Sequence, residues 1–401
     1  MVEGPATPVR SRPPSARDYD AVGVAARLGP AIRAVADRIE TTRRIPEPLL
    51  SELFDSGLFH LLLPRNFGGG EVHPREYFRA VAEVARHDGS VAWNMFVANS
   101  AALIAPHLEP ETAETIFAGG RTLIAWGPPN DCRLKAVEGG FLVRGRWDFA
   151  SGCRQANWIG VHAHVEEADG SLRLNRWGRP TVRTVLFPVA QATLLDTWNT
   201  IGLRGTASDS YTVEDVFVPQ SYSGTREDPE GRRSPGPLYA FTMQGLYAVG
   251  VAGVAVGLAR EMLDEFVTLA AMKTPRGQAR LADQAQVQGD VARAEARLGA
   301  AEAYLITTLE QITFRHQRPT GAIGVEDRGR VRLVCANAIH GAIEVADMVY
   351  KASGVSAIFP GSPFERRFRD MHTLSQQIQS RTSHFEAVGR ILLGQPDEGF
   401  M

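Results

Sequence analysis

The stretch "RWDFASGCRQANW", residues 146–158, decides how the middle of this chain folds. It begins with alternating apolar and polar residues, is interrupted by "ASGC", and continues into a second alternating run that starts at Trp158. A period of two is typical of β-strands with one buried face, and small residues between two such runs indicate a turn. Two interpretations are open: a β-hairpin whose aromatic side chains fill a core, or a wall for a flat aromatic ligand.

The same period extends on both sides of this stretch, from about Leu123 to Val218. Glycine-rich turns separate alternating runs that read "GGFLVRGRWDF", "NWIGVHAHV", "TVRTVLFPV" and "YTVEDVFVP". This pattern predicts a small antiparallel β-domain, a sandwich or a barrel, over residues 121–230.

Helical periodicity lies on either side of the predicted β-domain. The pattern of residues 19–107, broken at Pro46 and near Asp88, predicts an N-terminal helical domain over residues 19–120. Four long helical segments in series predict a C-terminal four-helix bundle over residues 231–401, and its last segment, residues 364–394, is expected to be one helix. We therefore expect a mainly α fold with a central β-domain.

Composition narrows the class of protein. Residues 1–18 are rich in proline and arginine without an apolar stretch, which predicts a flexible tail and not a signal peptide. The net charge of −2 gives no reason to expect nucleic acid or an acidic membrane as partner, and no apolar run long enough to span a bilayer is expected. Three widely spaced cysteines suit a reducing cytoplasm.

Familiar catalytic motifs are missing from the sequence. No glycine-rich nucleotide fingerprint, P-loop, H-E-x-x-H or G-x-S-x-G is present. His162 and His164 share one face of a predicted strand, but no third metal ligand accompanies them, so no metal site is predicted.

The order of the three parts, together with four stretches, resembles the acyl-CoA dehydrogenase superfamily. The four stretches are "RWDFASG", "DTWNTIGLRGTASDSYTVEDVFVP" (196–219), "KTPRGQARLADQAQVQ" (273–288) and "ASGVSAIFPGSPFERRFRDMHTLSQQ" (352–377). Within that superfamily the chain looks most like the oxygenase components of two-component flavin-dependent monooxygenases. This resemblance implies reduced FMN or FAD from a separate flavin reductase, O2 as co-substrate, and a flavin C4a-hydroperoxide that oxygenates a small aromatic or secondary-metabolite substrate.

The resemblance also implies residues that bind the flavin ring. Trp147 or Phe149 would supply an apolar wall, and the Ser151 hydroxyl would hydrogen-bond the ring near N5 and O4. Trp126, in "AWGPPN", falls where the family's loop lines the flavin. From the residues alone, a turn serine and plain core aromatics are equally ordinary.

Two further positions are implied for the rest of the cofactor. Arg276, with Lys273 beside it, falls where a cofactor phosphate is met, and a guanidinium suits such contacts. Gly354 resembles the turn that lets a partner subunit's cofactor tail pass. Solvated charges and a helix cap are the alternatives that the sequence leaves open.

The substrate and catalytic residues are less well defined by the resemblance. Trp93 falls in the family's substrate pocket, where Asn94 and Asn99 are candidates to reach it. The resemblance puts the dehydrogenase's glutamate base at Gln377 or Ile378, neither of which can abstract a proton, and where the monooxygenases often carry a histidine this chain has Gln376 and Gln377. His372 and His384 are the candidates for acid–base work, and a scaffold role is the alternative.

Two other functions stay open at this point: an acyl-CoA or acyl-carrier dehydrogenase with bound FAD, and a non-redox relative that uses the scaffold for binding. The apolar, small-residue face of "LYAVGVAGVAVGLA" (246–259) and the family habit predict a homotetramer.

Overall fold

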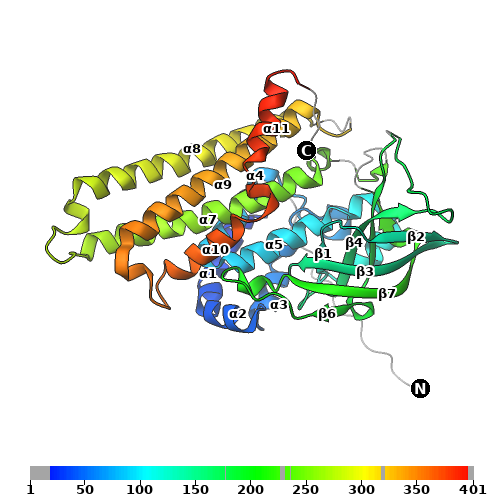
Figure 1. Ribbon diagram of the computed structural model, residues 1–401, viewed down its shortest axis with the longest axis horizontal. Helices are drawn as coiled ribbons and strands as arrows, with labels where there is room; N and C mark the ends of the chain where they lie inside the picture. Colours follow the sequence, from blue (N-terminus) through cyan, green and yellow to red (C-terminus); the bar gives the residue numbers. More distant parts are fainter. Residues whose placement is uncertain (1–18, 177, 226–230, 235, 318–320, 396–401) are drawn as a thin grey trace.

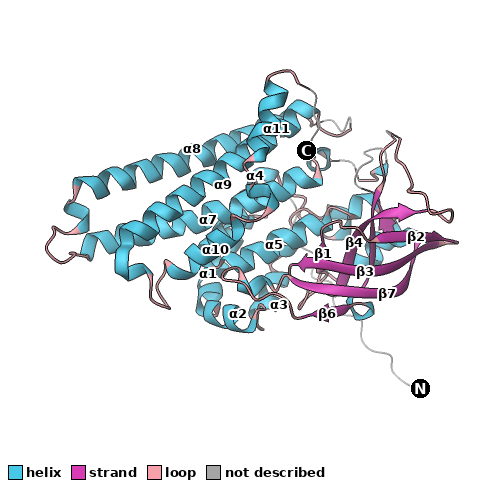
Figure 2. Cartoon of the chain, viewed as in Figure 1, coloured by secondary structure: helices cyan, strands magenta, loops and turns pink. Residues whose placement is uncertain are grey.

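The computed structural model describes residues 19–176, 178–225, 231–234, 236–317 and 321–395. The predicted tail over residues 1–18 and the predicted domain boundary at residue 230 lie outside the described residues. Figure 1 and Figure 2 show two regions side by side, a long helical bundle and a twisted sheet, with the N-terminal helices between them.

The N-terminal region is helical, as predicted, and its last long helix lies at the centre of the molecule. Its helices are α1 (Ala21–Ala34), α2 (Ala36–Thr42), α3 (Leu49–Asp55), α4 (Pro74–His87), α5 (Gly89–Ala102) and α6 (Pro110–Phe117). The Asp88 side chain separates α4 from α5 because it accepts a hydrogen bond from the Val91 backbone and caps α5. Every residue of α5 is buried, since this helix packs on α4, α7 and β1 at once.

The central region is one mixed sheet. Its strands are β1 (Ile124–Gly127), β2 (Arg133–Val137), β3 (Gly140–Ala150), β4 (Trp158–Glu166), β5 (Val182–Pro188), β6 (Thr193–Leu195), β7 (Asp209–Pro219) and β8 (Ser223–Gly224). They lie in the order β6-β7-β3-β2-β4-β5-β8, and β1 pairs with β4.

Two pairings correct the expectation of a purely antiparallel β-domain. Both β1 and β2 run parallel to β4. The stretch "ASGCRQAN" is therefore not the turn of a hairpin: it carries the chain across β2, so that β3 and β4 are not neighbours. Because β3 is antiparallel to β2 and β4 is parallel to it, β3 ends at the end of the sheet where β4 starts, and the connection only has to pass β2.

The C-terminal region is a helical bundle whose last predicted helix is broken. Its helices are α7 (Met243–Met272), α8 (Ala285–Arg315), α9 (Val325–Ser353), α10 (Glu365–Leu374) and α11 (Ser383–Leu392), with the short 3₁₀ turns η10 (Gly354–Ala357) and η11 (Ile378–Ser380). Between α10 and α11 the backbone of Gln377 is extended, and the Ser375 and Ser380 hydroxyls bond the carbonyls of His372 and Leu374. Side-chain hydrogen bonds of this kind compete with the helix, which explains a break without glycine or proline.

The most apolar helix of the bundle is also its core. By length and composition α7 and the segment Val325–Ala357 could span a membrane, but 89% of the most apolar window of α7 is buried inside the protein, and 56% of that of the second segment. No such run was expected from the sequence. The apolar character of α7 follows from its position among α4, α5 and α9.

Candidate functional site

A glycine-containing loop, residues 202–208, brings the three regions together. A side chain at Gly202 would meet the carbonyl oxygen of Arg369 on α10 at 2.1 Å, and one at Gly205 would meet the Ile39 side chain on α2 at 2.2 Å. The Gly205 backbone also donates to the Ser90 hydroxyl on α5 at 3.1 Å. Only glycine permits this close approach of backbones, so "GLRGT" is the point where both helical regions contact the sheet.

A continuous row of polar groups starts at this loop. Thr206 Oγ1 donates to the Leu203 carbonyl at 2.8 Å and lies 2.7 Å from Ser208 Oγ. Ser208 Oγ lies 2.6 Å from Ser151 Oγ, and Trp93 Nε1 donates to Ser151 Oγ at 3.0 Å. We call these four side chains and the Leu203 carbonyl the hydroxyl chain. All four side chains are buried, so the sheet and α5 are joined by polar contacts that water does not interrupt.

An unsatisfied acceptor lies next to the hydroxyl chain. Asn94 Nδ2 donates to the Gly205 carbonyl at 3.2 Å, whereas the buried Asn94 Oδ1 has no hydrogen-bond partner among the described residues. A side chain at Gly152 would come within 3.3 Å of this Oδ1. A buried acceptor without a donor is costly, and a ligand that carries an N–H group at this place would satisfy it.

Aromatic side chains from three elements extend the site toward the bundle. Trp93 and Phe96 of α5, Tyr247 of α7 and Trp126 of β1 form a series of edge-to-face contacts with ring centroids 4.8, 5.0 and 5.7 Å apart. We call these four residues the aromatic wall. Gln377 hydrogen-bonds the Tyr247 hydroxyl, whose pKa is raised because the ring is buried. The wall is therefore apolar, neutral and largely screened from solvent.

The backbone at this place is unusually strained. Six described non-glycine residues have left-handed φ angles, and three of them, Phe149 (62°), Leu203 (49°) and Ala207 (39°), lie in or beside the loops that carry the hydroxyl chain; the others are Arg43, Glu71 and Asp215. Such conformations are uncommon outside glycine and cluster where a structure positions functional groups.

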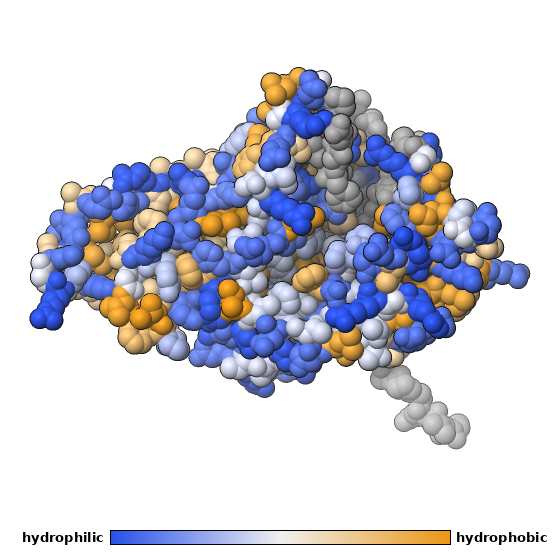
Figure 3. Space-filling model, viewed as in Figure 1, coloured by the Kyte–Doolittle hydropathy of each residue, from blue (hydrophilic) through white to orange (hydrophobic). Residues whose placement is uncertain are grey.

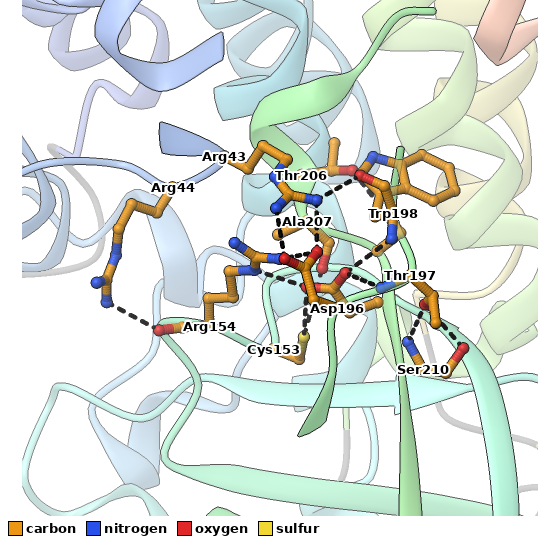
Figure 4. A network of polar contacts seen from close by, with 12 residues as sticks. Arg43, Arg44, Cys153, Arg154, Asp196, Thr197, Trp198, Thr206, Ala207 and Ser210 are labelled. Carbon is orange, nitrogen blue, oxygen red and sulfur yellow. Dashed lines mark hydrogen bonds and ion pairs between the residues drawn. The ribbon is translucent and has the colours of Figure 1, made fainter. Parts of the chain in front are cut away.

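A network of ion pairs holds these strained loops in place (Figure 4). Arg43 pairs with Asp196 at 2.6 Å and donates to the Trp198 carbonyl at 2.9 Å. Arg154 bridges Asp196 and the buried Asp209, at 2.8 and 2.6 Å. Because Asp209 also accepts from the Trp198 backbone at 2.8 Å, the network joins the end of α2 to both loops that form the hydroxyl chain.

One buried carboxyl group stands directly behind the loop. Asp370 Oδ1, on α10, accepts from the Leu203 backbone at 2.5 Å. Burial, and next the neighbouring Asp88 carboxylate, raise the pKa of Asp370 to about 7. Burial likewise raises the pKa of Asp88. These two acids meet where α5, α10 and the 202–208 loop contact one another.

The predicted flavin-wall residues divide between the surface and the core. Phe149 is 62% exposed, and the edge of its ring faces Trp198 with centroids 6.4 Å apart, so one apolar ring is available beside Ser151. Trp147 is fully buried, stacks on Tyr211 and donates to the His162 carbonyl at 3.4 Å. Because a ring enclosed in the sheet core has no free face, Trp147 is a packing residue here, which corrects its assignment.

The structure also corrects the prediction that the Asn99 side chain reaches a substrate. Its side chain accepts from the Leu62 backbone at 3.0 Å and donates to the carbonyls of Leu58 and Met95, which ties the preceding loop to α5. Five residues along a helix turn the side chain about 140° away from Asn94, so the two asparagines point to different neighbours.

Neither candidate histidine contacts the aromatic wall or the hydroxyl chain. His372 hydrogen-bonds Asp347 of α9 at 3.0 Å and packs its ring on Phe368. His384, on α11, contacts the Ile378 carbonyl at 2.7 Å, and burial and then Arg332 lower its pKa. His372 lies within α10 on the side that meets Asp347 of α9, and the break after α10 changes the helical spacing on which the assignment of His384 depended.

Arg276 and Gly354 lie at the opposite end of the bundle. Arg276 is exposed in the connection after α7, and Gly354 begins η10, where the Lys273 ammonium donates to the Ser353 carbonyl at 2.6 Å. From Tyr247 to the end of α7 is a run of about 25 residues, or about 38 Å along the helix axis. Within one subunit these two residues therefore cannot reach a ligand that lies against the aromatic wall.

Several residues of this site were not predicted from the sequence: Ser208, Thr206, Phe96 and Tyr247. A signal was present for the first two, since "GTASDS" places hydroxyls at alternate positions within a stretch already quoted for its resemblance. Phe96 and Tyr247 carried no signal, because aromatic residues in buried helices are ordinary core.

Two grooves on the described surface are lined by residues outside the hydroxyl chain and the aromatic wall. One open groove lies between α8 and α9, beside Asp347 and Lys351, and a second lies beside β5, near Arg183 and Arg233. In the part of the chain that the structure describes, no group of three histidine, cysteine or acidic side chains could hold a metal ion. Cys153 is buried with its thiol 3.3 Å from the Ala207 carbonyl, and burial raises the pKa of this thiol to about 12.

A helical N-terminal region, a central sheet and a C-terminal bundle that meet at one polar and aromatic site define the acyl-CoA dehydrogenase fold. The family description "Acyl-CoA dehydrogenase, N-terminal domain" matches residues 24–114, and "Acyl-CoA dehydrogenase, C-terminal domain" matches residues 249–381. Together they match more than half of the chain, and the chain belongs to this superfamily.

Similar proteins within the superfamily are oxygenases. An indole-3-acetate monooxygenase of Pseudomonas putida is 29% identical, over 93% of this chain and 96% of that protein. The flavin-dependent monooxygenase oxygenase subunit HsaA of Rhodococcus jostii is 28% identical, over 86% of this chain and 90% of that protein. The family and fold predicted from the sequence are confirmed, and these relatives have the predicted class of activity.

Two solved structures have the same fold. XiaF from Streptomyces, in complex with FADH2 and glycerol, is 21% identical with a TM-score of 0.85, over 95% of this chain and 96% of that chain. TdsC from Paenibacillus, in complex with FMN and indole, is 20% identical with a TM-score of 0.79, over 96% of this chain and 100% of that chain.

Proposed function

We propose that this protein is the oxygenase component of a two-component flavin-dependent monooxygenase. Reduced FMN or FAD, delivered by a separate reductase, would bind between Phe149, Ser151 and the aromatic wall. When bound, a reduced flavin supplies the two electrons that activate O2 for transfer of one oxygen atom to a substrate. The observation that carries this proposal is the hydroxyl chain beside an unsatisfied buried acceptor, in a chain whose similar proteins are flavin-dependent monooxygenases.

The residues present fit a flavin ring. Phe149 offers an exposed apolar face, Ser151 a hydroxyl, and Asn94 an acceptor without a donor in the described chain. Gly152, which has no side chain and has φ of 77°, lets the backbone after Ser151 lie close to Asn94, since a Cβ there would come within 3.3 Å of Asn94 Oδ1. A flat ligand with an apolar face and a polar edge matches this set of groups.

The aromatic wall supports oxygen transfer in preference to dehydrogenation. A dehydrogenase of this superfamily needs a carboxylate base, and the position to which the resemblance assigns that base holds Gln377, which bonds Tyr247. A neutral wall that excludes water suits an oxygenase, because it limits the loss of activated oxygen as peroxide.

The substrate class follows from the same wall. Edge-to-face aromatic contacts already join its members, and a small aromatic substrate makes contacts of the same kind. One relative acts on indole-3-acetate, and one neighbour of the same fold holds indole, so an indole or phenol is our first candidate.

We further propose that the enzyme assembles from identical subunits, as a homotetramer in the cytoplasm. If Arg276 and Gly354 meet a cofactor's phosphates, they must belong to another subunit than the one whose wall holds the ring. Exposed apolar side chains surround both residues, namely Met272, Val355, Ile358 and Phe359. Figure 3 shows an apolar patch at the end of the bundle where α9 meets α10, and its burial between subunits would remove it from water.

Transfer of oxygen from O2 tests the proposal. The protein would be incubated with FMN or FAD, NADH, a panel of indoles and phenols, and a flavin reductase kept behind a dialysis membrane that passes flavin but not protein. Under ¹⁸O2 we expect one labelled oxygen atom in a product, and none when flavin is omitted. A protein that is purified with tightly bound FAD and oxidises acyl-CoA thioesters without incorporating oxygen would contradict it.

A further inference from the structure

The hydroxyl chain has only one possible direction of donation. Trp93 Nε1 carries a hydrogen and can only donate, and the Leu203 carbonyl at the other end can only accept. Thr206 has one hydroxyl proton, which it gives to this carbonyl, so Thr206 Oγ1 must accept from Ser208. Ser208 has then used its own proton and must accept from Ser151.

The direction of the chain fixes what Ser151 can offer to a ligand. A serine hydroxyl has one proton and two lone pairs. Ser151 gives its proton to Ser208 and uses one lone pair for Trp93, so one lone pair is left. Ser151 can therefore accept a hydrogen bond from a ligand, but it can donate one only if the bond to Ser208 is broken.

We infer that the hydroxyl chain makes this site selective for the reduced form of flavin. The inference rests on the proposed function, which puts Ser151 at the ring edge beside N5. Reduced flavin carries a hydrogen on N5 and donates to Ser151, whereas oxidised flavin has a lone pair there and meets the lone pair of Ser151. Ser208 and Thr206 are thus positioning residues that determine redox selectivity without touching the flavin, and Trp93 fixes the direction of the chain from its other end.

Two further observations agree with this assignment. Asn94 Oδ1, the unsatisfied acceptor beside Gly152, adds a second group that calls for a donor on the ligand. The ends of the chain are also fixed: Trp198 Nε1 donates to the Leu203 carbonyl at 2.9 Å, and Asp370 accepts from the Leu203 backbone. The acceptor at the end of the chain therefore cannot rotate away.

Removing a link should release the proton of Ser151. In Ser208→Ala this proton has no acceptor in the chain and becomes available to oxidised N5. In Thr206→Val, which keeps the shape of the side chain, Ser208 can turn its proton toward Ser151, and Ser151 must then donate to the ligand. Both variants should bind oxidised flavin more tightly, and the ratio of oxidised to reduced dissociation constants should fall about three- to tenfold, the value of one hydrogen bond.

Binding of FMN in both redox states tests the inference. Oxidised FMN is titrated by fluorescence quenching, and reduced FMN by anaerobic calorimetry, for the wild type, Ser208→Ala, Thr206→Val and a control, Ser210→Ala. Ser210 lies at the start of β7, two residues after Ser208, but its hydroxyl donates to Asp148 at 2.6 Å and is outside the hydroxyl chain. Thermal unfolding confirms that each variant is folded, and the two variants break different links, so either one is sufficient.

The outcomes separate this inference from the proposed function. A fall in the ratio for Ser208→Ala or Thr206→Val, with the wild-type ratio kept in Ser210→Ala, supports it. A tenfold fall corresponds to a potential of bound flavin that is lower by about 30 mV, which a redox titration measures independently. Wild-type selectivity in both folded variants overturns the inference and leaves the proposed function standing. A wild type that binds neither form of FMN or FAD overturns the proposed function itself.

Discussion

Replacing Asp370 by asparagine should remove a pH dependence of stability that arises at the junction of the three regions. Asp370 is 4% exposed, bonds the Leu203 backbone and faces Asp88. Because burial and Asp88 raise its pKa to about 7, from an ordinary value near 3.8, the folded state binds a proton more tightly than the unfolded chain does. Its contribution to stability is therefore fully present below about pH 4 and is lost as the pH rises through 7.

The size of this pH dependence follows from the shift in the pKa of Asp370. Each pKa unit corresponds to about 1.4 kcal/mol, so between pH 5 and pH 8 the wild type should lose about 2–3 kcal/mol that Asp370→Asn keeps. Asparagine retains an oxygen for the Leu203 backbone and stays neutral at every pH. The variant should accordingly gain about 2–3 kcal/mol in stability relative to the wild type between pH 5 and pH 8.

Urea unfolding at pH 5, 6, 7 and 8 measures the difference between the two proteins. Asp131→Asn, which removes a carboxylate from an exposed loop, controls for the loss of charge alone. The reasoning is refuted if the difference in unfolding free energy between Asp370→Asn and the wild type is the same at all four pH values.

Three further predictions concern the site. Asn94→Leu removes the unsatisfied acceptor and should weaken anaerobic binding of reduced FMN about two- to tenfold; unchanged affinity would mean that Oδ1 does not face the ligand. His372→Ala and His384→Ala should keep the wild-type ratio of product to NADH consumed, because neither residue contacts the aromatic wall, and a loss of about 10²-fold in the rate of oxygen transfer would restore an acid–base role. Iodoacetamide at pH 8 should label the partly exposed Cys132 in the folded protein and not Cys153, whose pKa is raised by burial; peptide mass spectrometry checks this, and early labelling of Cys153 would show that the loop above it opens.

Much of the architecture could be predicted from local patterns. The change from a period of 3.6 to a period of two and back separates the three regions, and the glycines of "GLRGT" mark the place where they meet. The resemblance implies a flavin-edge role for Ser151, and the structure adds its partners Trp93 and Ser208.

The remaining features depend on contacts between distant parts of the chain. The parallel pairing of β4 with β2 cannot be read from alternation, which is the same for both directions of a strand. The break at Gln377 has no glycine or proline to announce it, because serine and glutamine side chains replace the lost backbone bonds. The direction of the hydroxyl chain needs the 203 carbonyl and the Trp93 indole at its two ends, and these are 110 positions apart in the sequence.

Whether this site is built for reduced flavin is measured most directly by the ratio of the dissociation constants of oxidised and reduced flavin for the wild-type protein. If the site is built to receive reduced flavin and use it with O2, anaerobic titration should show reduced FMN or FAD binding about three- to tenfold more tightly than the oxidised form, the value of one hydrogen bond made in one redox state only. Equal affinity for both forms, or tighter binding of the oxidised form, would contradict the account.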